Sequence, residues 1–573
     1  MAADQQEGGQ VAWWTRAVVY QVYPRSFMDS DGDGVGDLGG LLLRLDHLAD
    51  LGVDVVWLSP VYPSPQADNG YDISDYQDID PLFGSLEQLD ELISAMHARG
   101  MKLVMDLVVN HTSDQHPWFL EARSSTDSAK RDWYWWRPPR AGMAAGEPGA
   151  EPTNWQSFFS GPVWELDEPS GEYYLHLFDR RQPDLNWENP DVRQAVYAMM
   201  RWWLDRGVDG FRMDVINMIS KDVGPDGHLH DGPPLPGSSL GDGSASYLSG
   251  PRIHEFLQEM HREVFTGRSD ALLTVGEMPG VTVEQARLFT DPARGEVDMV
   301  FQFEHVGLDH GTSKWDVHPL RLRDLKASFG RWQAGLAEVG WNSLYWDNHD
   351  QPRAVSRFGD DSPEFRRDSA TCLATLLHLH RGTPYVYQGE EIGMANFPFT
   401  ALEEFRDIES LNHHVQAVSA GDDPAHVLAA LRTMGRDNAR TPVQWDATPN
   451  AGFTTGTPWI AVNPDHAEWN VAAQRDDEQS VLAHHRRLIA LRHTDDVVAL
   501  GDFHMLLPGH DEVYAFTRSL DGDTLLVVCN LSRTPYRLAE LLPEAPGAEL
   551  VLGNLPDDDP AQLRPWEARV LRV

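Results

Sequence analysis

Cysteine is nearly absent from this chain of 573 residues. Cys372 and Cys529 stand in apolar runs far apart in the sequence, which favours two buried free thiols over a disulfide. This usage fits a reducing compartment, so we expect a cytoplasmic protein. The first ten residues contain neither a basic segment nor an apolar one and do not resemble a signal peptide. No apolar run approaches the roughly 18 residues of a membrane span, so none is expected.

Basic residues are also scarce. The chain has 46 Lys and Arg against 88 Asp and Glu, which gives a formal charge of −42. A surface this acidic repels phosphate backbones and anionic lipids, so we expect neither nucleic acid nor a membrane as a partner. High solubility is the simplest meaning of the charge. Aromatic residues are plentiful at 10%, enough for a large core and a ligand site.

Short apolar segments alternate with helical patterns over most of the chain. The eight expected strands are 17–24, 53–60, 101–111, 207–215, 271–279, 297–304, 341–350 and 382–391. Helical periodicity lies between them, for example at 41–51, 86–99, 190–206 and 253–265. Eight strands with intervening helices predict an α/β fold, a (β/α)₈ TIM barrel. A doubly wound open sheet is the alternative, but no Gly-rich dinucleotide fingerprint follows the first strand.

Irregular segments interrupt this alternation and suggest domain boundaries. We expect barrel residues at 13–111, a small inserted domain at 112–186, the rest of the barrel at 187–500 and an antiparallel β domain at 501–573. The second barrel part contains a Gly- and Pro-rich loop at 224–249 and a subdomain at about 395–469. Loops after the strands of a TIM barrel carry its active site, so these inserts are expected to wall a pocket.

The segment Gly207–Val215 is an apolar strand with two charged residues. Arg212 and Asp214 are two apart and therefore share one face of the strand. The arginine favours the ionised form of Asp214, which a nucleophile requires, although an ordinary buried ion pair would look the same. Polar residues also end the third, fifth and seventh strands: Asp106, Asn110 and His111, then Glu277, then His349 and Asp350.

In a parallel barrel these strand ends converge on one face. Two carboxylates that flank a bond are the arrangement required for glycoside hydrolysis, in which one attacks the anomeric carbon and the other protonates the leaving oxygen. Arg212 suits Asp214 to the first role. Glu277 has apolar neighbours, which raise the pKa of a carboxyl group and suit it to the second role.

Four motifs resemble the signature regions of glycoside hydrolase family 13, the α-amylase superfamily. They are Asp106–His111, Gly210–Asp214, Gly276–Glu277 and Asn348–Asp350. The resemblance runs from about Trp13 to the C-terminus. It is closest to the oligo-1,6-glucosidase and α-glucosidase branch, whose further motifs are matched at 182–187, 301–305, 405–409 and 436–445. It implies a retaining reaction through a covalent glucosyl-enzyme.

The resemblance also implies roles for individual residues. Asp214 would be the nucleophile, Glu277 the acid/base and Asp350 a third carboxylate that binds ring hydroxyls. The pocket for the terminal glucose would include Asp68, Tyr71, His111, Phe178, Gln182, Arg212, Val215, His349 and Arg440. Tyr71 would stack on the sugar, and Asp68 and Arg440 would pair across a closed floor. A closed floor implies release of single glucose units from the non-reducing end.

The residue after the nucleophile indicates the linkage. In the resembling branch, Val at the position of Val215 accompanies action on α-1,6 bonds, whereas α-1,4 enzymes tend to have smaller or polar residues there. A β-branched side chain would narrow the side of the pocket that receives the leaving group. We therefore expect hydrolysis of isomaltose and isomalto-oligosaccharides, with an α-1,4-glucosidase (maltase) as the alternative.

Two other enzyme activities and one non-catalytic role are alternatives to this activity. Trehalose-6-phosphate hydrolase also tends to carry this Val, but it needs cations for the phosphate, and the inserts here are acidic. An isomaltulose synthase would carry an Arg-Leu-Asp-Arg-Asp run, which is missing. Non-catalytic relatives that serve as partners of amino-acid transporters lose the catalytic carboxylates, which this chain keeps. We expect a small oligosaccharide substrate and a monomer or weak homo-oligomer.

An acidic loop near the N-terminus has the spacing of a metal site. Carboxylates alternate with glycines, as at the start of an EF-hand loop, but the bidentate Glu that ends such a loop is missing. The same loop binds calcium, sometimes assigned as magnesium, in the resembling glucosidases. The expected ligands of a structural Ca²⁺, with Mg²⁺ as an alternative ion, are Asp29, Asp31, Asp33, Val35 and Asp37. An acidic Asp-Gly turn without an ion is the other interpretation.

Overall fold

The computed structural model describes residues 11–225, 227–268, 272–543, 545, 547–556 and 559–573. Some sequence predictions include residues outside this set, among them the loop 224–249 and the C-terminal β domain 501–573. The predicted strand 271–279 begins with one such residue, and the expectation of no signal peptide concerns residues 1–10.

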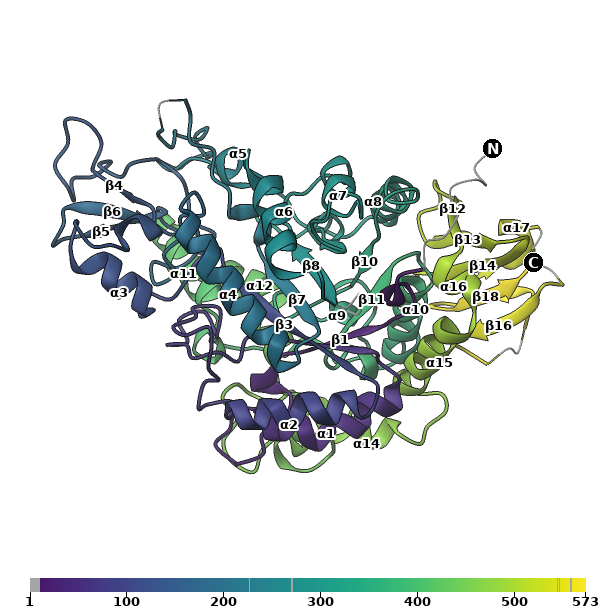
Figure 1. Ribbon diagram of the computed structural model, residues 1–573. Helices are drawn as coiled ribbons and strands as arrows, with labels where there is room; N and C mark the ends of the chain where they lie inside the picture. Colours follow the sequence, from purple (N-terminus) through teal and green to yellow (C-terminus); the bar gives the residue numbers. More distant parts are fainter. Residues whose placement is uncertain (1–10, 226, 269–271, 544, 546, 557–558) are drawn as a thin grey trace.

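Eight parallel strands form the centre of the molecule (Figure 1). Their order in the sheet is β10-β11-β1-β2-β3-β7-β8-β9, and a parallel bridge between Val300 and Asn342 joins its two ends. The strands are β1 Val19–Val22, β2 Val55–Leu58, β3 Lys102–Val108, β7 Gly210–Asp214, β8 Leu273–Glu277, β9 Met299–Phe301, β10 Ser343–Leu344 and β11 Thr383–Tyr387. The predicted TIM barrel is confirmed, and the closed sheet excludes the doubly wound alternative.

Helices follow the barrel strands along the chain. They are α1 Leu38–Leu51, α2 Leu86–His97, α4 Pro190–Arg206, α6 Ile253–Val264, α7 Val283–Phe289, α8 Leu322–Gly335, α10 Arg366–His378 and α15 Val481–Thr494. Local signals set their ends. The Asn189 side chain caps α4, Pro190 occupies its first position, and Gly207 ends it in a left-handed conformation with φ 115°. These residues stop α4 directly before the strand that carries Arg212 and Asp214.

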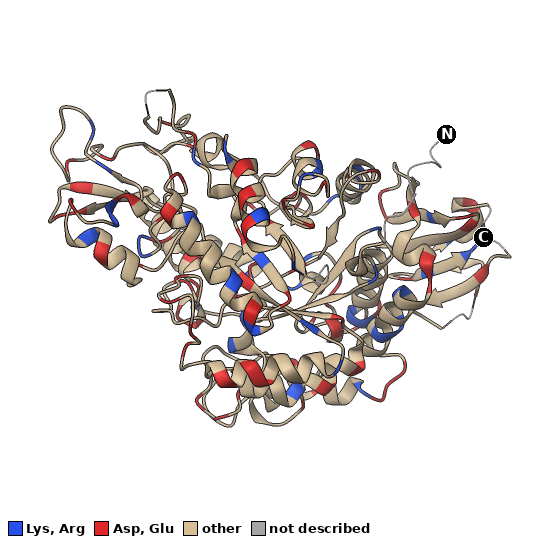
Figure 2. Cartoon of the chain, viewed as in Figure 1, with Lys and Arg blue, Asp and Glu red and all other residues tan. Residues whose placement is uncertain are grey.

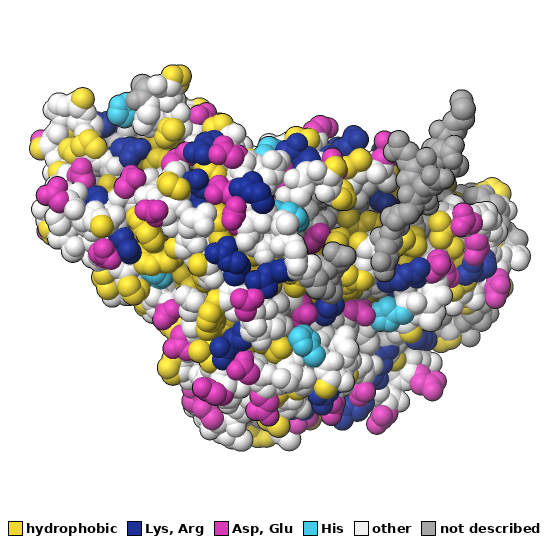
Figure 3. Space-filling model, in the orientation of Figure 1, with side chains coloured by type: hydrophobic (Ala, Val, Ile, Leu, Met, Phe, Trp, Pro, Cys, Tyr) yellow, Lys and Arg dark blue, Asp and Glu magenta, His cyan; other side chains and the backbone are white. Residues whose placement is uncertain are grey.

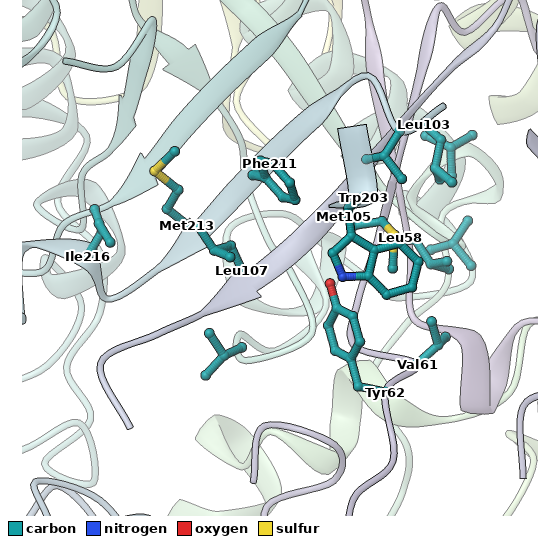
Figure 4. Close-up of a cluster of buried hydrophobic side chains, with 14 of the residues drawn as sticks. Leu58, Val61, Tyr62, Leu103, Met105, Leu107, Trp203, Phe211, Met213 and Ile216 are labelled. Carbon is teal, nitrogen blue, oxygen red and sulfur yellow. The ribbon is translucent and has the colours of Figure 1, made fainter. Parts of the chain in front are cut away.

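Alternation along the strands separates the core from the site. Every second side chain of β3 and β7 lies in a buried apolar cluster together with Trp203 of α4. These side chains are Leu103, Met105 and Leu107 of β3, and Phe211 and Met213 of β7 (Figure 4). The intervening Asp106, Arg212 and Asp214 point to the opposite side of the sheet. Because β3 and β7 pair in parallel with Asp106 beside Arg212, the charged residues meet at one place. The shared face predicted for Arg212 and Asp214 is confirmed.

Two antiparallel sheets lie at opposite ends of the molecule in Figure 1. Segment 112–186 contains α3 Pro117–Ser124 and a sheet of order β4-β6-β5, with β4 Trp136–Arg137, β5 Trp164–Asp167 and β6 Glu172–Leu175. The C-terminal sheet has the order β12-β13-β14-β18-β16. Its strands are β12 Asp502–Leu506, β13 Val513–Leu520, β14 Asp523–Asn530, β16 Glu549–Gly553 and β18 Ala568–Arg572. An insert after β3 and a C-terminal β sheet were both predicted; the domain boundaries stay a prediction.

The other two irregular segments contain helices. The segment 395–469 includes α11 Ile408–Ala420, α12 Pro424–Met434 and α13 Asp437–Arg440. The segment 224–249, which was expected to be a loop throughout, includes the short α5 Ser244–Tyr247. Both segments follow barrel strands, so they lie on the side of the barrel where the site is expected.

The two cysteines agree with the sequence prediction of buried free thiols. Cys372 on α10 and Cys529 on β14 are free and buried. None of the helices that the structure describes has both the length and the apolar character needed to cross a bilayer. Acidic and basic side chains are interspersed on the face that Figures 2 and 3 show, so the negative charge there is not gathered into one patch.

Three histidines lie buried between α10 and α15. They are His378, His484 and His485, and the rings of His378 and His485 are 5.6 Å apart. Within the described part of the chain, neither ring nitrogen of His378 has a hydrogen-bond partner. Burial lowers the pKa of His378 and His484 well below 6.5, and it lowers the pKa of His485 to about 4.

We expect these histidines to make the protein sensitive to mild acid. Their pKa values are lower in the folded chain than in the unfolded one, so below pH 6.5 the unfolded chain binds more protons. The free energy of unfolding should therefore decrease as the pH is lowered below 6.5, by up to about 1.4 kcal/mol per histidine for each pH unit. In urea unfolding between pH 7 and pH 5, His378→Phe should reduce this fall. His504→Asn, on the exposed edge of β12, is the control. A fall as steep in His378→Phe as in the control would contradict the explanation.

Candidate active site

A cavity of about 260 Å³ lies where the barrel strands meet the inserts. Its lining has five carboxylates, Asp68, Asp214, Glu277, Asp350 and Glu409, and two cations, Lys314 and Arg436. The other lining residues are Tyr71, His111, Phe158, Phe159, Phe178, Val215, Met218, Pro279, Phe303 and Gln351. Segments 112–186 and 395–469 both contribute residues, so the prediction that the inserts wall a pocket is confirmed for these two. It is wrong for the third segment, 224–249, of which no described residue is in the lining. That segment packs on the inserted segment instead, where Trp155 Nε1 donates to the His230 carbonyl at 2.8 Å.

Arg212 holds three carboxylates at the base of the cavity. Its Nη1 donates to Asp106 at 2.8 Å and to Asp214 at 2.7 Å, and its Nη2 lies 2.6 Å from Glu277. Two nitrogens of one guanidinium therefore bind Asp214 and Glu277, which brings these two carboxyl groups close together. A short separation is what a retaining glycosidase needs, because an inverting one leaves room for a water between its carboxyl groups.

Burial raises the pKa of both Asp214 and Glu277, while the Arg212 guanidinium opposes the rise. The charges of Glu277 and Asp106 raise the pKa of Asp214 further. Three buried carboxylates around one guanidinium repel one another, so the protonation of each depends on the charge of the other two. The prediction that Arg212 keeps Asp214 ionised was incomplete, because it omitted burial and the neighbouring carboxylates.

Asp350 has the opposite electrostatics. Arg440 Nη2 donates to its carboxylate at 2.8 Å, Arg436 Nη1 donates at 3.2 Å, and His349 Nε2 lies 3.2 Å away. Burial raises the pKa of Asp350, but the charged guanidinium groups of Arg436 and Arg440 outweigh burial and hold the pKa below its usual range. Asp350 therefore stays ionised. It lies in the loop beyond β10 and not at a strand end, because β10 is only two residues long.

The ion pair at the floor differs from the predicted one. Asp68 pairs with Arg436 at 3.2 Å and not with Arg440, which instead contacts Asp350 and Asp407. Arg436 and Arg440 are four residues apart at the two ends of α13, so they lie on one side of it. That spacing could have indicated that both arginines reach the pocket. Burial raises the pKa of Asp68 to about 7, and Arg436 opposes the rise.

Five of the nine predicted pocket residues line the cavity: Asp68, Tyr71, His111, Phe178 and Val215. The other four lie behind the lining and contact it. Gln182 Nε2 is 3.2 Å from both Asp68 and His111. Arg212, His349 and Arg440 reach Asp214 or Asp350 as described above.

Aromatic and histidine rings form one wall. Tyr71 stacks on His349 with ring centres 5.0 Å apart, and its hydroxyl donates to Asp106 at 3.1 Å. Burial lowers the pKa of His111 to about 4 and that of His349 to about 3, so both rings are neutral at pH 7. Neutral rings can donate and accept hydrogen bonds with sugar hydroxyls. Sugar stacking on Tyr71 stays a prediction.

Sequence reasoning missed several residues of the lining. Lys314 Nζ pairs with Glu409 at 2.5 Å, which joins the loop after β9 to the insert after β11. Phe158 stacks on Phe178 at 5.1 Å, and the Arg436 guanidinium lies 4.9 Å above the ring of Phe159. The adjacent phenylalanines were a visible signal in the inserted segment, whereas no pattern singled out Lys314.

The acidic loop brings three predicted metal ligands together. Oxygens of Asp29, Asp31 and Asp37 all lie within 4.8 Å of one another. Asp33 is outside this group, and its carboxylate accepts the Val35 N–H at 2.7 Å. Three converging carboxylates repel one another unless a cation joins them, and hard oxygen ligands suit Ca²⁺ or Mg²⁺. Asp29, Asp31 and Asp37 therefore fit the predicted ion, whereas Asp33 and Val35 are not among the residues whose oxygens converge.

Comparison with known proteins covers nearly the whole chain. A family model for the alpha amylase catalytic domain matches residues 21–501. An oligo-1,6-glucosidase from Parageobacillus thermoglucosidasius is 54% identical, over 98% of this chain and 99% of the relative. The crystal structure of Bacillus licheniformis trehalose-6-phosphate hydrolase is 44% identical with a TM-score of 0.89, over 98% and 99%. That of isomaltulose synthase from Klebsiella sp. LX3 is 41% identical with a TM-score of 0.92, over 98% and 100%.

Proposed function

Because this chain belongs to the α-amylase family, glycoside hydrolase family 13, we propose that it is a retaining, exo-acting α-glucosidase that prefers α-1,6 links. The substrate would be isomaltose and short isomalto-oligosaccharides. The observation that carries the proposal is one small acidic cavity in which Arg212 holds Asp214 and Glu277 side by side. The α-1,6 preference is supported by the 54% identity to an oligo-1,6-glucosidase and by Val215 in the lining.

The reaction would proceed in two displacements. Asp214 forms a bond to the anomeric carbon while Glu277 gives its proton to the leaving oxygen, and the glycosidic bond breaks. A water then gives a proton to Glu277 and attacks the same carbon from the leaving-group side, which releases Asp214 and restores the α configuration. Glu277 must therefore alternate between its two protonation states, which suits a carboxyl group whose pKa is raised by burial.

Exo action is supported by the floor of the cavity. Arg436 pairs with Asp68, Asp350 and Asp407, so its guanidinium ties the segments around the cavity together. A chain end can enter such a closed site, but the middle of a glucan would need an exit on the far side. Each turnover would then release one glucose from the non-reducing end.

The linkage preference can be tested at Val215. Val215→Thr keeps a β-branched shape but adds a hydroxyl, which provides a hydrogen-bond partner for the α-1,4 leaving group. We expect the ratio of kcat/KM for maltose to that for isomaltose to rise by about tenfold. Val215→Ile retains the apolar β-branched side chain and should keep the ratio of the parent enzyme. Equal ratios in both variants would show that residue 215 does not set the linkage.

Trehalose-6-phosphate hydrolysis is the second candidate, favoured by the 44% identical structure and by Lys314 in the lining. Charge argues against it. Both cations of the lining already have carboxylate partners, Lys314 with Glu409 and Arg436 with Asp68, and carboxylates outnumber cations by five to two. A phosphate dianion would have to displace one of these partners.

We further propose that Asp29, Asp31 and Asp37 hold a structural Ca²⁺, with Asp33 and the Val35 carbonyl completing the site and Mg²⁺ as an alternative. Removing the ion with EDTA should lower Tm, because an ion at about 100 times its Kd stabilises the folded state by about 2.7 kcal/mol. The kcat well below Tm should not change. Asp31→Asn should abolish the response of Tm to calcium. An undiminished response in Asp33→Asn would remove Asp33 from the ligands.

We also propose a cytoplasmic location and a monomer or weak homo-oligomer. The two buried free thiols support the location, because they fit a reducing compartment. The formal charge of −42 supports the weak association, because like-charged copies of the chain repel one another.

A further inference from the structure

The residue after Asp214 has an unusual backbone conformation. Val215 has φ 35° and ψ 40°, in the left-handed region. This region costs a β-branched residue on the order of 1–3 kcal/mol, and such residues persist only where their surroundings impose the conformation. Val215 is 6% exposed and belongs to an apolar cluster with Met218, Trp155 and Tyr247. The cluster fixes its side chain and leaves its strain unrelieved.

This conformation directs a backbone donor at the second carboxyl group. The Val215 N–H donates to Glu277 Oε2 at 3.1 Å, and Arg212 Nη2 lies 2.6 Å from the same oxygen. The chain after Val215 is held in place. A different φ at Val215 would therefore turn the preceding peptide group and move its N–H away from Glu277. The strained angle thus has a consequence for the site. Val215 is also the N-cap of the short 3-10 helix Ile216–Met218, and its carbonyl accepts the Met218 N–H at 2.9 Å.

Asn217 provides the anchor beyond Val215. The side-chain Nδ2 of Asn217 donates to the backbone carbonyl of Pro279 at 2.9 Å, and the backbone carbonyl of Asn217 accepts the Ser249 N–H at 2.8 Å. Pro279 is two residues after Glu277. The turn that follows one carboxylate is therefore bonded directly to the loop that follows the other.

We propose that the turn Val215–Asn217 is a positioning element for Glu277, which it holds in place through the Val215 N–H and the Asn217–Pro279 hydrogen bond. The inference rests on the acid/base role proposed for Glu277. The N–H favours the ionised carboxyl, which is the form that must take a proton from water in the second displacement. Arg212 alone cannot supply this control, because Asp214 and Asp106 share its charge.

The expected signature is a change in pH dependence. Losing a donor to the carboxylate raises the pKa of Glu277, so the basic limb of the rate profile should move to higher pH. The other charged or titratable groups that face Glu277 are Arg212, Asp214, Asp106, Asp350 and Tyr345. Replacement of Asn217 removes none of them.

The first test is Asn217→Ala, assayed over pH with isomaltose and with p-nitrophenyl α-glucoside. Isomaltose needs a proton from Glu277 to expel its leaving group, whereas nitrophenolate leaves without one. We expect kcat/KM to fall by about tenfold or more for isomaltose and by about twofold or less for the aryl glucoside, with the basic limb moved upward. Ser249→Ala is the matched control, since Ser249 Oγ meets the Asn217 side chain only at 3.4 Å, and it should keep the parent profile.

A second variant isolates the backbone donor. Replacing Val215 by its α-hydroxy acid gives an ester that keeps the side chain and removes only the N–H. The basic limb should again move upward, and this variant decides the matter if Asn217→Ala does not fold. Equal losses on both substrates with the basic limb in place, in either folded variant, would overturn the proposal and leave Asn217 a merely structural residue.

Glu277→Gln separates this inference from the proposed function. If Glu277→Gln retains isomaltose hydrolysis, the role of Glu277 is wrong and the proposed function fails with it. If Glu277→Gln is inactive on isomaltose while the two positioning variants keep the parent pH profile, the positioning inference alone fails.

Discussion

Asp214→Ala should lower kcat for isomaltose by on the order of 10³-fold or more, and added azide should restore turnover of an activated aryl glucoside. The alanine removes the group that forms the covalent intermediate and leaves a space beside Arg212. Azide can occupy that space as an anion, next to the guanidinium that bound Asp214 at 2.7 Å. Its attack comes from the face that Asp214 used, so the product should be β-glucosyl azide, with inverted configuration.

Asp106→Asn is the matched control for this experiment. Asp106 binds the same guanidinium at 2.8 Å, but it lies behind the cavity and does not line it. Its loss should reduce activity through Arg212, and azide should restore nothing. Full activity in Asp214→Ala, or glucosyl azide formed equally by Asp106→Asn, would remove Asp214 from the role of nucleophile.

Arg436→Ala should have the largest effect on stability. Arg436 is buried and pairs with Asp68, Asp350 and Asp407; Arg440 can still serve the last two, but Asp68 loses its ion-pair partner. Removing one partner of a buried pair costs about 3–5 kcal/mol in the free energy of unfolding. Urea unfolding should show the loss, together with a raised KM. Arg436→Lys keeps the charge and should lose less.

The same variant gives a pH test with a definite sign. Burial already raises the pKa of Asp68 to about 7 with Arg436 present, and without the arginine it should rise further. The cost of Arg436→Ala should therefore be smaller at pH 5.5, where Asp68 is neutral, than at pH 8. Adding Asp68→Asn should recover part of the stability at pH 8. Additive losses in the double variant would show that the two residues are not coupled.

The barrel and the places of Asp214 and Glu277 at strand ends could be predicted because their signals are local. The apolar residues of β7 alternate with Arg212 and Asp214, and the capped helix before it fixes where that strand starts. Glu277 is the last residue of β8, so a strand pattern places it directly. In such cases a period of two and the geometry of a parallel barrel are sufficient.

The remaining features depend on contacts that no local pattern contains. The pair of Asp68 and Arg436 joins residues 368 apart, so choosing between Arg436 and Arg440 requires the folded chain. The predicted seventh strand, 341–350, is only Ser343–Leu344 as β10, because its polar end turns into the loop that carries Asp350. The left-handed angle of Val215 contradicts the preference of its residue type. Tertiary contacts impose it, and a sequence pattern does not report them.

The most direct test of the account is the initial rate of glucose release from isomaltose, maltose and trehalose 6-phosphate at equal concentration, with the anomer first released from p-nitrophenyl α-glucoside, which contains a single glucose, identified by NMR. We predict that isomaltose is hydrolysed fastest and that α-glucose appears first, before mutarotation. β-Glucose as the first product would contradict the retaining mechanism, and a higher rate on maltose or on trehalose 6-phosphate would contradict the proposed substrate.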